Sequence, residues 1–375
     1  MKDNLLSRRM KLTISQEDLS NGLQSVHNIV SSRTTLPILS NVLLSAKDNK
    51  LELTATDLDL TVSRTVEAKV IEQGEFTLPV KKLFGIARAT GSPQIEMDVS
   101  AGHCKIQSGS FSTKLNGLPA EEFPPKPEIK GRTRVSISQE KLRKLLKRTA
   151  YAVSADENRY VLNGIFVRIE EKMLTMVATD GRRLAMSEAE LEEEAENKEE
   201  IIIPTKAVQE LTRIMDEEGT IEIQVTDTQT QFYIQGKESA RITTKLVEGT
   251  YPNYRQVIPK ETKHRVSLDK EELLHAVKRA EILTNDKANS VKFTFTENCL
   301  TFSSNTPEIG ESTETMAIKY TGEETSIAFN PQYFIDPLKT MEEDEIQFEF
   351  TDQLSPGVIK VKNPFLYVIM PMRTT

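Results

Sequence analysis

The stretch TISQEDL at residues 13–19 returns as SISQEKL at residues 136–142, which is 123 positions later. The tripeptide ATD recurs with the same shift, at residues 55–57 and 178–180. A third and fainter copy begins with VSLD at residues 266–269. A repeat of this length is far longer than a solenoid repeat and equals an ordinary domain. The chain is therefore predicted to hold three copies of one fold.

Each copy has the same order of predicted elements. A short strand comes first, followed by a helix with apolar residues at helical spacing, such as Leu19 and Leu23 in the first copy. Strands of alternating polarity follow. A second helix is expected to start near a proline, at Pro79, Pro204 and Pro331 in the three copies. Two helices against antiparallel strands define an α+β unit.

We expect three domains, at residues 10–128, 134–255 and 256–375. Each has a length close to the usual size of an independent domain. Pro337 falls inside the second helix of the third copy and is expected to kink or shorten it, because proline lacks the backbone N–H that a helix interior needs.

The composition is that of an ordinary globular protein: of 375 residues, 38% are hydrophobic and 28% are charged. No apolar run is long enough to span a membrane, and the start MKDNLLSRRM lacks the apolar core of a secretory signal. Cys104 and Cys299 are too far apart for a CxxC zinc site. Phosphate-loop, dinucleotide and hydrolase motifs are absent. We expect a cytoplasmic protein without metal or cofactor.

The balance of charge limits how the chain could bind nucleic acid. Lysine and arginine total 48 against 56 acidic residues, so the net charge is −8 and the whole surface cannot wrap DNA. Lys141, Lys144 and Arg148 share one helix face that is expected to point away from the leucine stripe. That face is either simply solvated or a surface for the DNA backbone. Eight glutamates between residues 188 and 200 predict a solvated loop.

Two motifs could indicate a catalytic site. Asp57 and Asp180 follow the two ATD copies, but the repeat puts them in different domains, so turn formation is favoured over paired acid–base chemistry. The second copy continues as TDGRRL, and a hydrolase or transferase using Asp180 with Arg182 and Arg183 is the alternative. No nucleophile–base pair accompanies these residues. The apolar ending at residues 366–373 predicts either a last strand or a methionine-lined groove.

Several segments resemble the bacterial sliding clamps, the beta subunits of the DNA polymerase III holoenzyme. They are TLPILSNVLL (35–44), LTATDLDL (53–60), LNGIFV (162–167), VATDGRRLA (177–185), KLVEGTYPNYRQVIP (245–259) and VIMPMR (368–373). The resemblance runs in order from about Met10 to the end, and the pair VATDGRRLA and VIMPMR is specific. Residues 1–9 have no counterpart, so we expect either an upstream start or an added leader before Met10.

The resemblance implies a head-to-tail homodimer that closes into a ring of six domains, with helices lining the hole. Such a clamp encircles duplex DNA without sequence preference and tethers the replicative polymerase. A clamp loader opens the ring, and clamp-motif proteins of repair and replication control share it. The clamp itself catalyses no reaction.

Elementary geometry agrees with six domains rather than three. A globule of about 125 residues behaves as a sphere roughly 35 Å across. Three touching spheres leave a hole of only about 5 Å, whereas six leave about 35 Å. Duplex DNA is roughly 20 Å wide, so one chain cannot surround it and two can. A monomeric three-domain adaptor, which keeps a partner pocket but forms no ring, is the remaining alternative.

The resemblance also implies a pocket for partner peptides between the second and third domains. One wall would comprise Leu162, Thr179, Gly181, Arg182, Arg183, Leu184, Pro252 and Val257. The other would comprise Asn330, Tyr333, Leu354, Val368, Met370, Pro371, Met372 and Arg373. Apolar residues with a few polar anchors suit a short peptide that bears Leu or Phe. Gln256 stands where the family commonly has arginine, and Arg182 where it commonly has histidine.

Two further sets of residues follow from the resemblance. The positions that would face DNA are Arg33, Lys81, Arg159, Tyr160, Lys206 and Arg213. The dimer contact would use Lys82 and Phe111 of the first domain against Ile282, Leu283 and Glu308 of the third. An apolar centre with a charged rim is the usual anatomy of such an interface.

Overall fold

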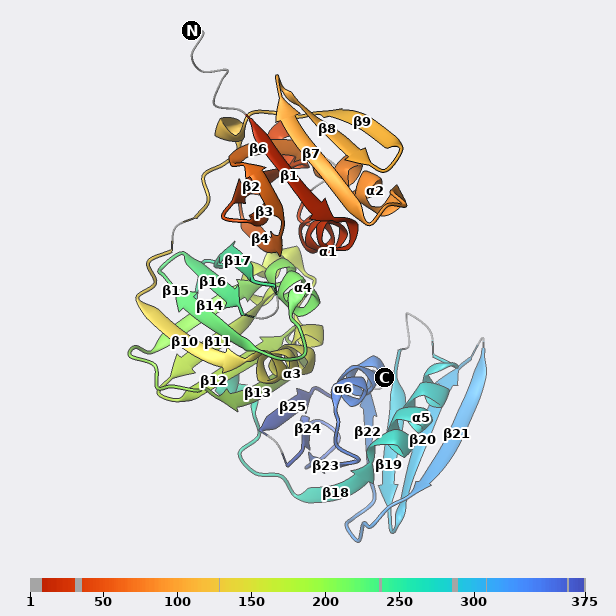
Figure 1. The fold of residues 1–375 in the computed structure, drawn as a ribbon. Helices are drawn as coiled ribbons and strands as arrows, with labels where there is room; N and C mark the ends of the chain where they lie inside the picture. Colours follow the sequence, from red (N-terminus) through yellow and green to blue (C-terminus); the bar gives the residue numbers. More distant parts are fainter. Residues whose placement is uncertain are drawn as a thin grey trace. The chain divides into compact units, whose positions relative to one another are not determined.

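The computed structural model describes residues 9–30, 36–127, 129–235, 238–284, 289–307, 309–362 and 364–373 (Figure 1). The chain divides into two compact units. The first comprises Met1–Glu140, Glu192–Asn197 and Gln209–Leu246, and the second comprises Lys141–Leu191, Lys198–Val208 and Val247–Thr375. Among the described residues, no helix is both long enough and apolar enough to cross a membrane.

The first unit contains two antiparallel sheets. The smaller has the order β5-β1-β7-β8-β9, with bounds β1 Met10–Ser15, β5 Lys69–Glu72, β7 Gln94–Ser100, β8 His103–Ser108 and β9 Phe111–Asn116. The larger has the order β10-β15-β16-β17-β4-β3-β2-β6. Its bounds are β2 Asn41–Lys47, β3 Lys50–Thr56, β4 Leu60–Glu67, β6 Gly74–Pro79, β10 Thr133–Ser138, β15 Thr220–Val225, β16 Gln229–Ile234 and β17 Ala240–Lys245.

The second unit also contains two sheets. The larger has the order β14-β11-β12-β13-β25-β24-β23-β18, with bounds β11 Gly164–Glu170, β12 Met173–Thr179, β13 Arg183–Glu190, β14 Glu199–Pro204, β18 His264–Asp269, β23 Glu345–Phe350, β24 Gly357–Lys360 and β25 Phe365–Ile369. The smaller has the order β21-β20-β19-β22, with bounds β19 Val291–Thr296, β20 Cys299–Thr306, β21 Gly310–Ala317 and β22 Thr325–Phe329.

The helices follow the predicted repeat. Their bounds are α1 Gln16–Val26, α2 Val80–Ala89, α3 Gln139–Thr149, α4 Thr205–Ile214, α5 Lys270–Glu281 and α6 Gln332–Thr340. Short 3-10 helices are η1 Pro37–Ser40, η2 Ala120–Glu122, η3 Ala150–Ala152, η4 Glu157–Leu162 and η5 Tyr254–Val257. The order strand, helix, four or five strands, helix, three strands occurs three times among these elements. The chain therefore has three repeated α+β domains, and the middle one contributes to both units.

The apolar spacing of α1 explains its place. Leu19, Leu23 and Val26 are fully buried, and they lie at the predicted helical interval. The helix begins where the Ser15 side chain accepts a hydrogen bond from the backbone N–H of Asp18, which satisfies one of the open donors of the first turn. The same motif, Ser-Gln-Glu, places Ser138 directly before α3, so the repeated sequence encodes a repeated helix start.

Two sheets run from one domain into the next. β17 pairs antiparallel with β4, with Thr243 opposite Thr61. β13 pairs antiparallel with β25, with Leu184 opposite Val368. Each pairing joins strands that lie more than 170 residues apart in the sequence. Backbone hydrogen bonds of a shared sheet therefore connect the neighbouring domains.

One expectation from the sequence is corrected. The segment between residues 188 and 200 is not one solvated loop, because Glu188 and Glu190 lie in β13, which ends at Glu190, and β14 begins at Glu199. Glu199 is only 2% exposed, although its chain neighbour Glu200 is exposed. The helix α6 continues through Pro337 and ends at Thr340; with nine residues it is the shortest of the six α-helices among the described residues, in line with the expected shortening. Pro337 is itself buried in α6, so burial of its ring compensates for the missing hydrogen-bond donor.

Candidate functional site

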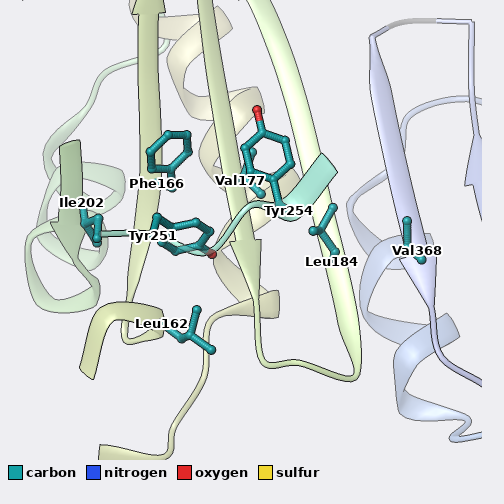
Figure 2. Packing of buried hydrophobic residues seen from close by; sticks show 8 residues of the cluster. All are labelled: Leu162, Phe166, Val177, Leu184, Ile202, Tyr251, Tyr254 and Val368. Atoms are coloured by element: carbon teal, nitrogen blue, oxygen red, sulfur yellow. The ribbon is translucent and has the colours of Figure 1, made fainter. Parts of the chain in front are cut away.

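The floor of the candidate site is an apolar cluster built where β13 meets β25 (Figure 2). Leu184 and Val368 face each other across this strand pair and are 2% and 1% exposed. The cluster comprises Leu162, Phe166, Val177, Leu184, Ile202, Tyr251, Tyr254 and Val368. The rings of Phe166 and Tyr251 stack with centroids 5.0 Å apart. The floor is therefore buried and apolar.

A cavity of about 310 Å³ opens in the same unit, beyond the end of β25. Its lining comprises Arg182, Asn330, Tyr333, Met370, Pro371, Met372 and Arg373. Backbone hydrogen bonds fix the segment after β25: the N–H of Met370 donates to the carbonyl of Arg182 at 2.9 Å, and the N–H of Met372 donates to the carbonyl of Ala328 at 2.7 Å. Phe365–Ile369 thus form a last strand, and Met370 and Met372 after it line a groove, so both predicted alternatives apply.

The predicted pocket residues separate into four groups. Seven line the cavity, as given above, and Leu162, Leu184 and Val368 form part of the floor. Pro252, Val257 and Leu354 are exposed and lie outside the cavity lining, with Val257 48% and Leu354 68% exposed. Of the remaining three, Thr179 ends β12, Arg183 begins β13, and Gly181 lies in the turn between these two strands.

That turn is held by Asp180. Its carboxylate accepts hydrogen bonds from the N–H groups of Arg182 at 2.9 Å and Arg183 at 3.0 Å. Asp57 does the same for Asp59 and Leu60 in the first domain, so the predicted turn role of both aspartates is confirmed. These turn hydrogen bonds account for Asp180 and Asp57 without any catalytic role.

Gly181 explains why the second copy departs from the first. Its φ is +86°, in the left-handed region that favours glycine. A Cβ at this position would lie 2.9 Å from Nη1 of Arg159. The first copy adopts nearly the same φ, +81°, at Leu58, where the strain is accepted. Glycine therefore removes strain from the turn that borders the cavity.

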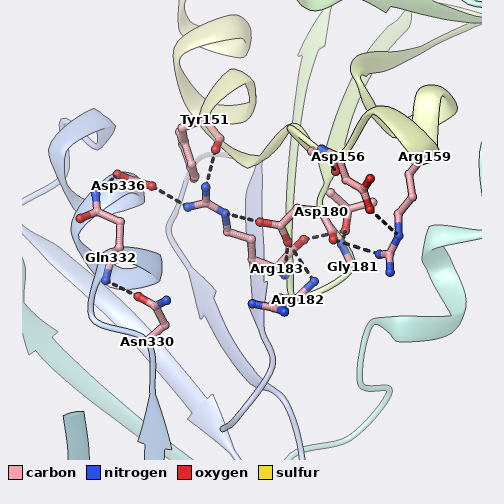
Figure 3. Close-up of polar contacts among 12 residues, drawn as sticks. Tyr151, Asp156, Arg159, Asp180, Gly181, Arg182, Arg183, Asn330, Gln332 and Asp336 are labelled. Carbon is pink, nitrogen blue, oxygen red and sulfur yellow. Dashed lines mark hydrogen bonds and ion pairs between the residues drawn. The ribbon is translucent and has the colours of Figure 1, made fainter. Parts of the chain in front are cut away.

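The two adjacent arginines have opposite surroundings (Figure 3). Arg182 is exposed and lines the cavity. The guanidinium of Arg183 is largely buried and donates to Asp180 Oδ2 at 3.1 Å, Asp336 Oδ2 at 2.6 Å and the carbonyl of Tyr151 at 2.6 Å. It also lies 4.8 Å from the ring centroid of Tyr333. Arg183 is thus a support for the wall residue Tyr333.

The charge of Arg183 is firmly maintained. Burial alone would lower its pKa, but Tyr367 and the carboxylates of Asp336 and Asp180 more than offset that effect, and the pKa of Arg183 is raised above its ordinary value. Burial raises the pKa of Tyr367 as well. Arg183 therefore stays charged and Tyr367 stays neutral through any ordinary pH range.

The basic face of α3 is used within the second unit. Arg148 is 2% exposed, which contradicts the expectation that it points away from the buried side. Its Nη2 donates to Glu343 at 2.6 Å, and its guanidinium lies 5.4 Å from the ring centroid of Phe365. Lys144 donates to Glu342 at 2.6 Å. Acidic residues after α6 provide partners that the α3 sequence by itself could not reveal.

The proposed DNA-facing residues lie in both units. Lys81 in α2, Arg159 and Tyr160 in η4 and Lys206 in α4 are all exposed, and Tyr160 is 58% exposed. Arg159 lies 3.5 Å from the carboxylate of Asp156. Arg33 lies outside the described residues. These assignments stay predictions.

Arg213 has a more complex environment. Its Nη1 donates to the carbonyl of Gln24 at 2.6 Å, its Nη2 donates to the carbonyl of Ser25 at 2.7 Å, and its Nε donates to Glu210 at 2.9 Å. The guanidinium thus joins α4 to the last turn of α1. A role toward DNA would require this residue to leave or share those acceptors.

The proposed dimer residues are exposed on strands and helix ends. Lys82 is exposed on α2, and Phe111 at the start of β9 is 46% exposed. Ile282 follows α5 and is 73% exposed, whereas Leu283 is half-buried. Glu308 lies outside the described residues. Exposed large apolar side chains on edge elements suit association, and this assignment also stays a prediction.

The sequence reasoning did not find Asp336, Tyr151 or Phe166. Asp336 lies in α6 and reaches Arg183 from the other domain. No signal in its own segment separates it from a solvated helix residue. Alternation in β11 could not find Phe166 either, because this residue lies on the same strand face as Arg168 and Glu170, opposite to Ile165, Val167 and Ile169.

Comparisons with known proteins cover nearly the whole chain. Family models match in order: DNA polymerase III beta subunit N-terminal domain at residues 10–127, central domain at 136–253 and C-terminal domain at 255–373. A beta sliding clamp of Chlamydia pneumoniae is 35% identical over 370 residues, which cover 97% of this chain and 99% of the relative. A beta sliding clamp of Pseudomonas aeruginosa is 33% identical over 376 residues, which cover 97% of this chain and 100% of the relative.

Solved structures agree with these matches. A DNA polymerase sliding clamp from Bacillus subtilis superimposes with a TM-score of 0.93 at 31% identity, covering 98% of this chain and 100% of that one. A sliding clamp from Pseudomonas aeruginosa bound to griselimycin has a TM-score of 0.92 at 33% identity, covering 97% of this chain and 100% of that one.

Proposed function

Because the chain belongs to the family of the DNA polymerase III beta subunit, the bacterial beta sliding clamp, we propose that two copies close head to tail into a ring of six domains around duplex DNA. The protein is a processivity clamp of DNA replication and not an enzyme. Its partners are DNA and the polymerase. We place its work in the cytoplasm and its domains at residues 10–128, 134–255 and 256–375.

The observation that carries the tethering role is the cavity beyond β25. An apolar floor, two methionines and a small number of polar groups form a site for a short peptide that bears Leu or Phe. Flexible methionine side chains allow one site to receive several partners in turn. These would be the polymerase subunit, the clamp loader and clamp-motif proteins of repair and replication control.

The ring would hold DNA by topology. Exposed basic residues such as Lys81, Arg159 and Lys206 would face the duplex and contact phosphates loosely. The net charge of −8 excludes a tight general affinity for DNA. Retention without tight contact lets the clamp slide, because no single phosphate has to be released before the next is met.

A topological link predicts that the clamp is retained on circular DNA and is lost from linear DNA. A clamp loaded on nicked circular duplex should stay bound during gel filtration at high salt and should dissociate when the circle is cut. Phe111→Asp is expected to remove this retention. Equal retention on linear and circular DNA would show that the protein binds DNA by direct affinity, which contradicts a topological link.

The proposed dimer contact is tested by mass. Ile282→Asp is expected to convert a dimer of twice 42.3 kDa into a monomer, because the 73%-exposed side chain would occupy the apolar centre of the contact. Sedimentation equilibrium over a dilution series measures this. Ile71→Asp is the matched control, since Ile71 is 58% exposed on β5 and outside the proposed contact. A monomeric wild-type protein would favour the three-domain adaptor.

Arg182 predicts a preference among peptides. Arg182 and Arg373 line the cavity and both are exposed, so a peptide with an acidic residue beside its Leu or Phe should bind more tightly than its neutral amide version. Arg182→Gln should weaken the acidic peptide by about threefold to fivefold, the scale of an exposed ion pair. Binding of the neutral peptide should not change. Titration calorimetry at low and high salt distinguishes the two outcomes, and an equal effect on both peptides would exclude the ion pair.

A further inference from the structure

The exposed face of α2 has a glycine at its centre. Gly85 is exposed and lies on the side of the helix opposite the buried Leu83 and Ala87. Lys81 is four residues before it and Arg88 three residues after it, so both exposed cations flank it on the same face. Glycine weakens a helix interior more than any residue except proline, so its presence here needs a reason.

The fold of the chain does not require glycine at this position. A Cβ added to Gly85 would meet no atom of the described residues within 4 Å. The helix is continuous from Val80 to Ala89, so the glycine serves no turn or helix end. A larger side chain would therefore fit and would strengthen the helix. The absence of a side chain is useful only if something outside the chain approaches the helix backbone here.

The repeat shows how α2 differs from its counterpart in the second domain. α2 and α4 each contain ten residues and begin 125 positions apart, so Gly85 corresponds to Glu210 and Arg88 corresponds to Arg213. In α4, the carboxylate of Glu210 accepts a hydrogen bond from Nε of Arg213 at 2.9 Å. In α2, glycine replaces this carboxylate. Arg88 therefore lacks the acidic neighbour that holds the equivalent arginine of α4.

The charge of α2 has one sign. Of the six α-helices in the described part of the chain, α2 alone contains no aspartate or glutamate, and it contains three basic residues. Neither Lys81 nor Arg88 forms an ion pair with a described carboxylate. The guanidinium of Arg88 instead lies 5.6 Å from the ring centroid of Phe84, which stacks on His27 at the end of α1. An aromatic ring thus holds Arg88 and leaves its charge for an anion.

The spacing of the two cations fits a single phosphate group. Lys81 and Arg88 are seven residues apart, which is about 10 Å along the helix axis. Gly85 lies between them, so a phosphate resting on the helix at the glycine would be within reach of both long side chains. A larger side chain at residue 85 would hold the phosphate away from them. The negative charge of the phosphate complements a helix that has only basic residues.

We propose that Lys81, Gly85 and Arg88 form a binding site for one phosphate of the DNA backbone, in which the glycine admits the phosphate and the two cations hold its charge. The site rests on the proposed function, in which the helices line the hole, and it adds Gly85 and Arg88 to the DNA-facing residues. A ring of two copies has two such sites. The contact is independent of base sequence, as sliding requires.

The probe for this site is a short, fluorescently labelled linear duplex of mixed sequence, titrated with the full-length protein at several salt concentrations. Arg88→Gln should weaken binding about threefold to fivefold at low salt. The slope of log affinity against log salt should become shallower by about 2 for a dimer, since each lost phosphate contact accounts for about 0.9. Gln73→Glu is the matched control: it changes the net charge equally, lies outside α2 between β5 and β6, and should bind as the wild type does.

Gly85→Gln tests the glycine itself, because it fills the space on the helix without a change of charge. It should weaken duplex binding about as much as Arg88→Gln does. Its midpoint of urea denaturation should rise, because glutamine is a much better helix former than glycine. A more stable protein with weaker DNA binding is the result that only an external role for Gly85 explains. Unchanged duplex binding by Gly85→Gln, or an unchanged salt slope of Arg88→Gln, would overturn the proposal.

Two further measurements distinguish other occupants of the site. If sedimentation equilibrium shows that Gly85→Gln turns a dimer into a monomer, a second copy approaches the helix there and the proposal is wrong. If sodium phosphate displaces the duplex more strongly than sodium chloride at equal ionic strength, the ligand is free phosphate and the proposal is also wrong. A wild type without salt-dependent duplex binding would overturn it as well. Failure of the clamp function itself would appear separately, as equal retention on linear and circular DNA.

Discussion

A chain carrying Met370→Asp and Met372→Asp is expected to bind a Leu- or Phe-bearing partner peptide about 100-fold more weakly than the wild type. Both methionines line the cavity, and the backbone of each is fixed by a hydrogen bond to a neighbouring segment. Aspartates there would have to lose water when the apolar peptide side chain enters. An unpaired, desolvated charge costs about 3 kcal/mol or more, which is about 100-fold in affinity.

Fluorescence anisotropy of a labelled peptide measures this loss. Met173→Asp is the matched control: Met173 is 40% exposed at the start of β12 and lies outside the cavity lining. The double variant should retain the mass and the circular dichroism of the wild type, because the backbone bonds of residues 370 and 372 do not depend on their side chains. If peptide affinity survived with the fold intact, partners would bind at another surface.

The repeat made much of the local structure predictable. Equal motifs predicted equal helix starts, and prolines at residues 79 and 331 directly precede α2 and α6. The turn role of Asp180 followed from its type and position. These features depend on residues close together in the sequence, where propensity and hydrogen-bonding chemistry act directly.

The pairing of distant strands was not predictable in the same way. Nothing in β13 specifies β25 as its neighbour, since both are short alternating strands with many compatible partners. The shared sheet depends on which edges remain open after each domain has formed. The apolar cluster that contains Leu184 and Val368 is a consequence of that pairing, so its place in the site could be assigned only by resemblance.

The surroundings of the charged residues were also not predictable from the sequence. Arg148 and Lys144 were expected on one face directed away from the leucine stripe, yet Arg148 is buried against Phe365 and paired with Glu343. A helical pattern specifies which residues share a face, but not what the rest of the chain places against it. Arg182 and Arg183 are neighbours in sequence, and only the structure separates the exposed one from the buried one.

Replacing Arg183, the buried member of that pair, is expected to have a large effect on the stability of the fold. Arg183→Met should lower the free energy of unfolding by about 3–5 kcal/mol, the usual result of removing one partner from a buried ion network. Asp180 and Asp336 would both lose their cation, and the carbonyl of Tyr151 would lose its donor. Urea denaturation followed by circular dichroism measures the change. Arg182→Met is the matched control and should stay within about 0.5 kcal/mol of the wild type, because Arg182 is exposed.

A compensating substitution separates lost charge pairing from lost packing. If the cost of Arg183→Met comes from the uncompensated carboxylate of Asp336, then adding Asp336→Leu should recover part of the stability, because a buried pair replaced by apolar residues is often tolerated. The double-mutant cycle should show a coupling of about 1–3 kcal/mol. The peptide affinity need not recover with it, since Tyr333 would still lack the guanidinium beneath its ring. Restored stability with weakened peptide binding would identify Arg183 as the support of the cavity wall. Full recovery of both would mean that Tyr333 holds its position without Arg183.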